Sequence, residues 1–193
     1  KSGRRLLETL NSVLNLSRLE AGEMDLSLEP VDLAYEADEV TQLFDPQVEE
    51  AGLELQLTRP ASPLWVRADQ GGLRIVLRNL ISNAVKFTDA DGTVWVRVRD
   101  HDGAATLEVE DTGVGIDPTR LPALFEAFEQ GSSGPGRSHE GSGLGLAVTK
   151  RLVNRMNGHI EVQTAKGEGT CFTITLPETT TSLSSQRPRA VES

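Results

Sequence analysis

Two asparagines and a lysine recur at helical spacing in the stretch NLISNAVKFT, residues 79–88. If residues 72–87 form a helix, Asn79, Asn83 and Lys86 lie on one face, within roughly 60° of one another. An amide oxygen is a suitable ligand for Mg²⁺, and a lysine ammonium is a suitable partner for a phosphate. A solvated outer helix face would show the same pattern, so this strip alone leaves both interpretations open.

A second candidate is the stretch DTGVGI at residues 111–116, which follows a predicted strand. Asp111 can accept a hydrogen bond from an exocyclic amine such as that of adenine. Gly113 and Gly115 allow the backbone to turn tightly or to approach a flat ligand closely. Taken alone, the motif is weak, because an Asp-x-Gly loop after a strand is more often an ordinary turn.

A third candidate is GSGLGL at residues 141–146, which leads into a predicted helix. Backbone amides at Gly141, Gly143 and Gly145, together with a helix N-terminus, form an anion site. The spacing is not the dinucleotide fingerprint, and the sequence contains neither the GxxxxGK[ST] loop nor the Ser/Thr/Tyr kinase motifs. A flexible linker before a helix is the alternative interpretation.

A fourth candidate is LFEAFEQ at residues 124–130, followed by a segment rich in Gly and Ser. Phe125 and Phe128 are three residues apart and share one face of a helix predicted over residues 121–129. Core packing explains at least one of them. A segment anchored by buried Phe and bounded by Gly behaves as a lid. Arg137 lies in this segment, where it either reaches a phosphate or is a solvated charge.

Composition excludes several classes of protein. The 193 residues carry a net charge of −10, which argues against a nucleic-acid partner. The single Cys171 excludes an internal disulfide and fits a reducing compartment. No apolar run is long enough to span a membrane. Because the chain starts at Lys1 rather than Met, we expect a fragment, with any membrane anchor outside it.

Hydrophobic periodicity indicates an α+β fold. An amphipathic helix is predicted over residues 4–20, with the stripe Leu6, Leu10, Val13, Leu14 and Ser17. Further helices are predicted over residues 32–52, 72–87, 121–129 and 146–156, with Asp32 as an N-cap and Pro46 near a kink or an early end. Strands are predicted over residues 53–57, 64–66, 93–99, 106–110, 160–163 and 171–176. The expected fold is a two-layer α/β sandwich in which three helices cover a mixed, mostly antiparallel sheet, preceded by the N-terminal helix.

In chain order the four stretches resemble the boxes of the ATP-binding catalytic domain of sensor histidine kinases, in the GHKL superfamily: residues 79–88 the N box, 111–116 the G1 box, 124–130 the F box and 141–146 the G2 box. The ending GEGTCFTITLP resembles the last hairpin of that family, and LNLSRLEAGEMDL resembles the end of its second dimerisation helix. The resemblance implies a helix end and linker over residues 1–28, an ATP-binding domain over residues 29–177 and a disordered tail over residues 178–193.

The resemblance also implies ATP and Mg²⁺ as ligands and assigns roles to the matching residues. Asp111 would accept a hydrogen bond from the adenine amino group, and Asn83 would ligate Mg²⁺. Asn79 would lie near the terminal phosphate, and Lys86 would contact phosphate. The other expected nucleotide-binding residues are Gly113, Gly115, Ile116, Phe128, Arg137, Gly141, Gly143, Leu144, Gly145 and Thr170.

Related ATPases of the gyrase and mismatch-repair type carry a Glu where Asn79 stands, and an amide cannot act as that base. Asn79 therefore favours phosphoryl transfer over hydrolysis. None of His101, His139 and His159 has the sequence context of the family's acceptor histidine. We expect transfer of the γ-phosphoryl of Mg-ATP to a histidine on a dimerisation helix outside this chain, with relay to a response-regulator Asp.

The expected partners follow from the same resemblance. They are a second copy, bound through the N-terminal helix of the full-length protein, and a receiver domain, with no nucleic acid. The domain is expected to be cytoplasmic, with membrane contact only through segments outside this chain. Two alternatives stay open, namely a catalytically silent module for nucleotide binding or dimerisation, and a GHKL-type ATPase.

Overall fold

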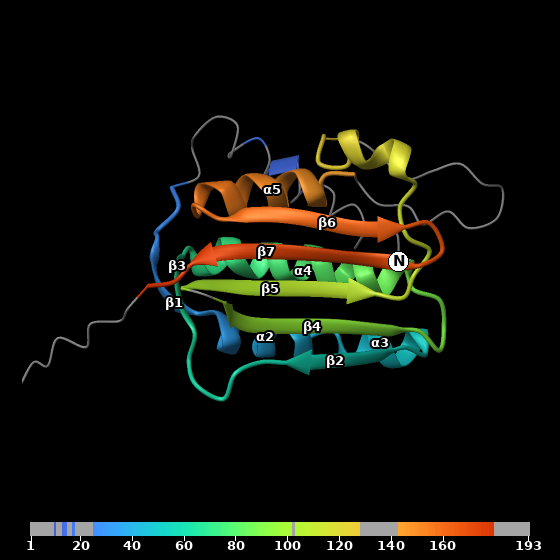
Figure 1. Cartoon of the computed structure of the whole chain (residues 1–193), viewed down its shortest axis with the longest axis horizontal. Coiled ribbons are helices and arrows are strands. Elements are labelled where there is room, and N and C mark those ends of the chain that lie inside the picture. The colour runs from blue at the N-terminus through green and yellow to red at the C-terminus, as the bar shows by residue number, and fades with distance from the viewer. Residues whose placement is uncertain are drawn as a thin grey trace, which may run out of the picture.

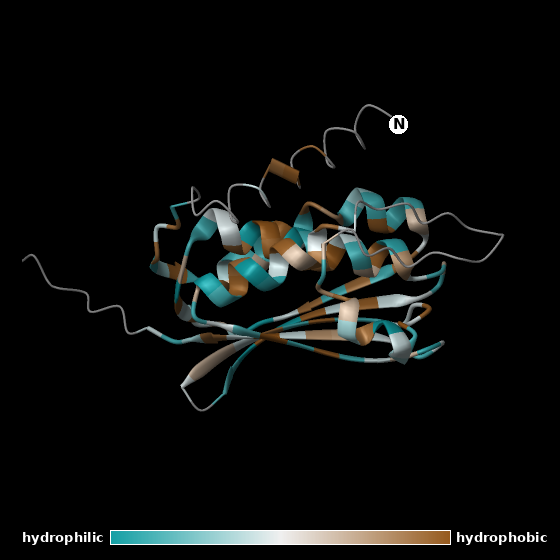
Figure 2. Cartoon of the chain, turned by 90° about the horizontal axis from the view of Figure 1, so that it is seen from above, coloured by the Kyte–Doolittle hydropathy of each residue, from teal (hydrophilic) through white to brown (hydrophobic). Residues whose placement is uncertain are grey.

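The computed structural model describes residues 25–101, 103–127 and 143–179, together with Leu10, Val13, Leu14 and Ser17. Within these residues, a five-stranded sheet has helices on one face only (Figures 1 and 2). In spatial order its strands are β2 (Glu54–Thr58), β4 (Thr93–His101), β5 (Ala104–Asp111), β7 (Gly169–Pro177) and β6 (His159–Ala165). The β2–β4 pair is parallel, and the other three pairs are antiparallel. The predicted mixed, mostly antiparallel sheet is therefore confirmed.

The helical layer contains α2 (Leu33–Gln42), α3 (Asp45–Ala51), α4 (Gln70–Phe87) and α5 (Gly145–Arg155). The prediction of a single helix over residues 32–52 is corrected, because the chain turns at Leu43 and Phe44 and α3 begins at Asp45. Pro46 occupies the first turn of α3, where its missing N–H costs nothing. Asp32 caps α2 as predicted, since its Oδ1 accepts from the N–H of Ala34 at 3.1 Å.

The helix predicted over residues 121–129 is also corrected. The structure has a 3₁₀ helix, η1 (Pro118–Ala123), followed by turns up to residue 127. Asp117 caps η1 by accepting from the N–H of Thr119 at 3.0 Å. Pro122 has no N–H and disfavours an α-helical turn around it, which explains why the segment does not continue as an α-helix.

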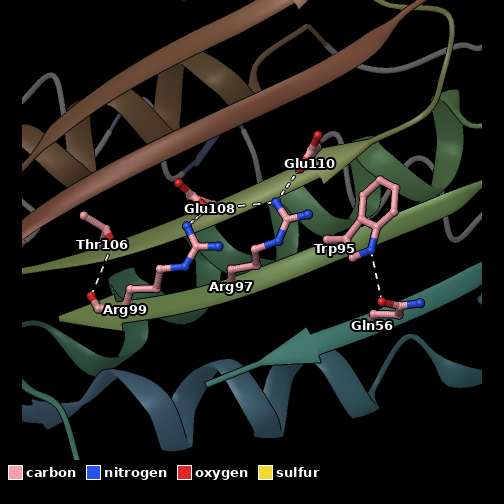
Figure 3. Close-up of polar contacts among 7 residues, drawn as sticks. All are labelled: Gln56, Trp95, Arg97, Arg99, Thr106, Glu108 and Glu110. Carbon is pink, nitrogen blue, oxygen red and sulfur yellow. Dashed lines mark hydrogen bonds and ion pairs between the residues drawn. The ribbon is translucent and has the colours of Figure 1, made fainter. Parts of the chain in front are cut away.

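Strand alternation separates an apolar inner face from a polar outer face. On the inner face, Val96 of β4, Val109 of β5 and Phe172 of β7 are neighbours and are all buried. Figure 3 shows the outer face, where ion pairs join Arg97 to Glu110 and Glu108, and Arg99 to Glu108. Beside them, Trp95 Nε1 donates to Gln56 Oε1 at 3.0 Å. The core therefore lies between the sheet and the helices.

A two-stranded sheet, β1 (Glu29–Asp32) with β3 (Trp65–Ala68), flanks the main sheet. The chain leaving β7 also joins β3, through a bridge between Val66 and Glu178 and a bond from the Thr179 N–H to the Trp65 carbonyl at 2.9 Å. One strand of the small sheet thus contacts the segments that precede and follow the main fold.

Two carboxylates fix the N-terminus of α4: one caps the helix, and the other is buried beside it. Asp69 accepts from the N–H of Gly72 at 2.6 Å, which caps the helix. Glu36 of α2 is 2% exposed and accepts from Gln70 Nε2 at 2.6 Å and Arg74 Nε at 2.5 Å. This hydrogen bonding to Glu36 raises the pKa of Arg74 above its usual value. These contacts set the start of the helix that carries Asn79, Asn83 and Lys86.

Most of the predicted N-terminal helix lies outside the described residues. Of its apolar stripe, Leu10, Val13 and Leu14 are described, and they are 53%, 40% and 45% exposed. Among the described residues, no helix combines the length and the hydropathy needed to cross a membrane.

Candidate functional site

The polar strip of α4 is half-buried. Asn79, Asn83 and Lys86 have intermediate exposure, whereas Arg74, Arg78 and Ser82 form the exposed face of the helix. The opposite face packs in the core through Leu73, Leu77, Leu80, Ile81 and Ala84. The strip is therefore not a solvated outer face, and it borders the neighbouring loops.

Asn79 joins α4 to the start of α5. Its Nδ2 donates to the carbonyl oxygen of Gly145 at 3.0 Å and to Thr149 Oγ1 at 3.3 Å. Leu144, just before α5, is fully buried, and Gly143 has a φ of +67°. The glycine-rich segment thus enters α5 directly against the polar strip.

Asp111 closes β5 with a side chain in a buried position. The residue is 7% exposed, and burial raises the pKa of its carboxyl group to about 6. Hydrogen bonds from the backbone N–H groups of Gly113, at 2.8 Å, and of Thr170 partly oppose this shift in pKa. A buried carboxylate with a raised pKa is typical of a functional site.

The loop over residues 111–116 is held at three points. The Val114 N–H donates to the Phe87 carbonyl at the end of α4 at 3.2 Å, and the Val114 carbonyl accepts from the Gly167 N–H at 2.8 Å. The Ile116 N–H donates to Thr164 Oγ1 at 2.9 Å. The loop is therefore clamped between α4 and the β6–β7 turn, at the right-hand end of the sheet in Figure 1.

Close backbone contacts explain the glycines around this loop. A Cβ at Gly113 would overlap the Phe87 carbonyl oxygen, and one at Gly115, whose φ is +63°, would overlap the Ala165 carbonyl oxygen. Gly169, whose φ is +86°, approaches the Asp111 carbonyl in the same way. An ordinary surface turn would leave room for side chains. This tight packing instead favours the interpretation that the loop forms one wall of a binding site.

Asp111 has polar neighbours that continue across the sheet. It lies opposite Thr170 of β7, which lies opposite Thr164 of β6. Thr170 is 6% exposed, and its Oγ1 is 3.1 Å from Thr164 Oγ1. Thr164 was not among the residues expected at this site. The alternation of Ile160, Val162 and Thr164 places Thr164 on the inner face, and this pattern in the sequence could have identified it.

Phe125 packs beside the site, which agrees with the core-packing interpretation of this residue. Its ring meets that of Phe172 edge to face, with 6.4 Å between centroids, and Lys150 Nζ lies 5.1 Å from the Phe125 centroid. The predicted residues Phe128, Arg137 and Gly141 lie outside the described residues.

The described residues suit a cation held jointly with a phosphate ligand. They contain no group of three or more His, Cys, Asp or Glu side chains able to hold a metal. The half-buried Asn83 offers a hard amide oxygen, and Mg²⁺ commonly takes one or two protein oxygens together with substrate phosphates. Lys86 Nζ lies 4.7 Å from the Phe87 ring, on the same strip. The donor set thus fits a magnesium–polyphosphate complex better than a metal ion alone.

Comparison with known proteins identifies the family. Residues 68–180 match the family described as "Histidine kinase-, DNA gyrase B-, and HSP90-like ATPase". The chain is 41% identical over 186 residues to the circadian input-output histidine kinase CikA of Synechococcus elongatus. That alignment covers 93% of this chain and 24% of CikA, so the chain spans about a quarter of that relative.

Solved structures agree with this match. Full-length ShkA in complex with AMPPNP superposes with a TM-score of 0.80 and 37% identity, over 93% of this chain and 37% of ShkA. The mycobacterial sensor histidine kinase MprB superposes with a TM-score of 0.68 and 32% identity, over 79% of this chain and 98% of the MprB chain. The chain therefore belongs to the sensor histidine kinase branch of the GHKL ATPases, and residues 68–180 match its ATP-binding domain.

Proposed function

We propose that this chain binds Mg-ATP and transfers the γ-phosphoryl group to a histidine on a dimerisation helix outside the chain. The observation that carries the proposal is that α4 contacts both glycine loops. The Phe87 carbonyl accepts from Val114 in the first loop, and Asn79 donates to Gly145 in the second. One rigid helix can therefore fix the distance between a base site at Asp111 and a phosphate site at the start of α5.

In this proposal the base lies against Asp111, Gly113, Gly115, Ile116 and Thr170. The Asp111 carboxylate accepts a hydrogen bond from the adenine amino group, and the two glycines let the base approach the backbone. Burial supports this role, because the N–H groups of Gly113 and Thr170 only partly offset the desolvation of the carboxylate, so a further donor from the base would stabilise its ionised form.

The phosphates lie along the strip and the N-terminus of α5. Lys86 contributes a positive charge, and the amides from Gly143 to Gly145, including that of Leu144, face the anion. Asn83 holds Mg²⁺, which supplies charge neutralisation to the transferring phosphoryl group. Phe128, Arg137 and Gly141, which lie outside the described residues, complete the set of nucleotide-binding residues in this proposal.

Asn79 supports transfer over hydrolysis. Its Nδ2 already donates to Gly145 and Thr149, and its amide has no basic group that could take a proton from water. The nucleophile is then an imidazole nitrogen from the acceptor helix. A nitrogen–phosphorus bond forms as the bond between the γ-phosphorus and the β–γ bridging oxygen breaks, ADP leaves, and the imidazole loses a proton.

The proposal extends to partners. An exposed apolar stripe at Leu10, Val13 and Leu14 needs a cover, and a second copy of the same helix is one. We assign residues 1–28 to the end of a dimerisation helix and linker, residues 29–177 to the ATP-binding domain and residues 178–193 to a tail whose first two residues, Glu178 and Thr179, pair with β3. The phosphohistidine then passes its phosphoryl group to a receiver Asp.

The test incubates the chain with γ-labelled Mg-ATP and a separately supplied acceptor-helix segment. Label on the segment is expected. Steady phosphate release without transfer would identify a GHKL-type ATPase, and bound ATP with neither outcome would identify a silent module.

Calorimetric titration with a non-hydrolysable ATP analogue tests the site itself. Asp111→Ala is expected to abolish binding, and Asn83→Ala to remove the Mg²⁺-dependent part of the affinity. Ser82→Ala, on the exposed face of α4 next to Asn83, serves as the matched control. Unchanged affinity in either site variant would contradict the role given to that residue.

A further inference from the structure

The inner face of the sheet ends in a polar row. One row inward, the neighbours across four strands are Val96, Val109, Phe172 and Val162, all apolar. At the end of the sheet, the corresponding neighbours are Val94, Asp111, Thr170 and Thr164. Three polar side chains in an otherwise apolar layer need a reason, because burying polar groups is unfavourable unless they are paired.

The hydroxyl protons of this row can be assigned from the hydrogen bonds. Thr164 has one hydroxyl proton, and its Oγ1 donates it to the Gly169 carbonyl at 2.8 Å. The same oxygen accepts from the Ile116 N–H at 2.9 Å. The contact between Thr164 Oγ1 and Thr170 Oγ1, at 3.1 Å, must then use the proton of Thr170. Thr170 is left with lone pairs only.

We propose that Thr164 is a positioning residue for base selection. By holding the hydroxyl proton of Thr170, it leaves Asp111 and Thr170 as adjacent acceptors, which favour a purine with a 6-amino group over one with a 6-oxo group. This inference rests on the proposed nucleotide site. A 6-amino group has two donors and matches both oxygens, whereas a 6-oxo group places an acceptor against the lone pairs of Thr170.

The same selection operates through a water molecule. A water that donates one proton to Asp111 and one to Thr170 has only lone pairs left for the base, so beside C6 it also favours an amino group over an oxo group. Asp111 contributes as an acceptor at pH 8, above the pKa of about 6 of its carboxyl group.

The test compares ADP with inosine diphosphate, which differs from ADP at C6 and N1 of the base. Isothermal titration at pH 8 with Mg²⁺ present gives the ratio of the two affinities for each variant. Thr164→Val keeps the side-chain shape but frees the Thr170 proton, which can then donate to a 6-oxo group. We expect the preference for ADP to fall about 5- to 10-fold, the size of one hydrogen bond. Thr164→Ser keeps the hydroxyl and is expected to keep the preference.

Two further variants make the result decisive if Thr164→Val is poorly folded. Thr170→Val removes the oriented acceptor while Thr164 keeps its bonds to Ile116 and Gly169, and the preference for ADP is again expected to fall. Thr175→Val, on the outer face of the same strand β7, is the control and is expected to change neither affinity.

Each remaining outcome has a distinct meaning. Equal weakening of both nucleotides in Thr164→Val would make Thr164 merely structural and would overturn the inference. An unchanged preference in Thr170→Val would overturn it as well. A wild-type chain that binds neither nucleotide would instead overturn the proposed function.

Discussion

The side-chain amide of Asn79 donates a hydrogen bond to the main-chain carbonyl of Gly145, at 3.0 Å, across 66 residues of sequence. This bond holds α4 against the first turn of α5. Asn83, one turn further along α4, makes no side-chain hydrogen bond within the described part of the chain. Asn79 therefore supports the packing of the two helices, whereas Asn83 makes no such contact, although the two side chains lie one helical turn apart.

The first prediction separates these two residues by stability. Asn79→Ala removes the donor for Gly145 and Thr149 and is expected to cost about 1–2 kcal/mol of unfolding free energy. Asn83→Ala is expected to change stability by less than about 0.5 kcal/mol while weakening binding in the presence of Mg²⁺. Urea unfolding of both variants measures this. Equal destabilisation would mean that Asn83 also supports the fold.

The second prediction concerns Asp111 and pH. Its folded pKa of about 6 exceeds the ordinary value near 3.9, so the folded state binds the proton more tightly than the unfolded state. The stability contribution of the protonated carboxyl is present below about pH 4 and is lost as pH rises through 6.

Asp111→Asn, which keeps an acceptor for the Gly113 N–H, is therefore expected to stabilise the nucleotide-free chain at pH 8 by up to about 3 kcal/mol. The gain should vanish near pH 4, and nucleotide affinity should fall. Urea unfolding at both pH values checks the sign. Lower stability of the variant at pH 8 would contradict the burial argument.

The third prediction compares two glycines in the β6–β7 turn. Gly167 and Gly169 have nearly the same φ, +84° and +86°, but only a Cβ at Gly169 would meet other atoms, those of the backbone of Asp111 and Thr112. Gly167→Ala is expected to cost about 1–2 kcal/mol from backbone strain alone. Gly169→Ala should cost more and should also weaken nucleotide binding, because it displaces Asp111. Thermal melts and titration of both variants test this; equal effects would exclude a specific contact.

The fourth prediction concerns the buried Glu36. Arg74→Met leaves a carboxylate that is 2% exposed without its charged partner and is expected to cost about 3 kcal/mol. The double variant Glu36→Leu with Arg74→Met should recover much of that loss, because no buried charge is left. A double-mutant cycle in urea measures the coupling. Additive losses would show that the ion pair contributes little.

Local sequence patterns predicted much of the fold. Period-two alternation located β4, β5, β6 and β7 and both hairpins, because each hairpin pairs residues that are close in sequence. The pairing of β5 with β7 and the parallel pairing of β2 with β4 join distant segments, which no local pattern specifies. Pro46 marked the break between α2 and α3, but the effect of Pro122 on η1 was missed.

The site was predictable in its residue types more than in its contacts. Helical spacing placed Asn79, Asn83 and Lys86 on one strip, and the structure shows that strip half-buried. The bond from Asn79 to Gly145 and the row from Asp111 to Thr164 depend on tertiary packing. The ligand roles of these residues stay predictions until nucleotide binding is measured.

The strand β3 has a consequence for how the domain is carried in longer proteins. β3 pairs with β1, where the chain enters the fold, and bridges to Glu178, where the chain leaves it. The two ends of the domain therefore lie close together. A unit whose two ends meet can be inserted between other modules without its flanking segments reaching around the sheet. β3 therefore makes this ATP-binding unit suitable for insertion at different places in longer proteins. Disruption of β3 would loosen the pairing of both flanking segments at once.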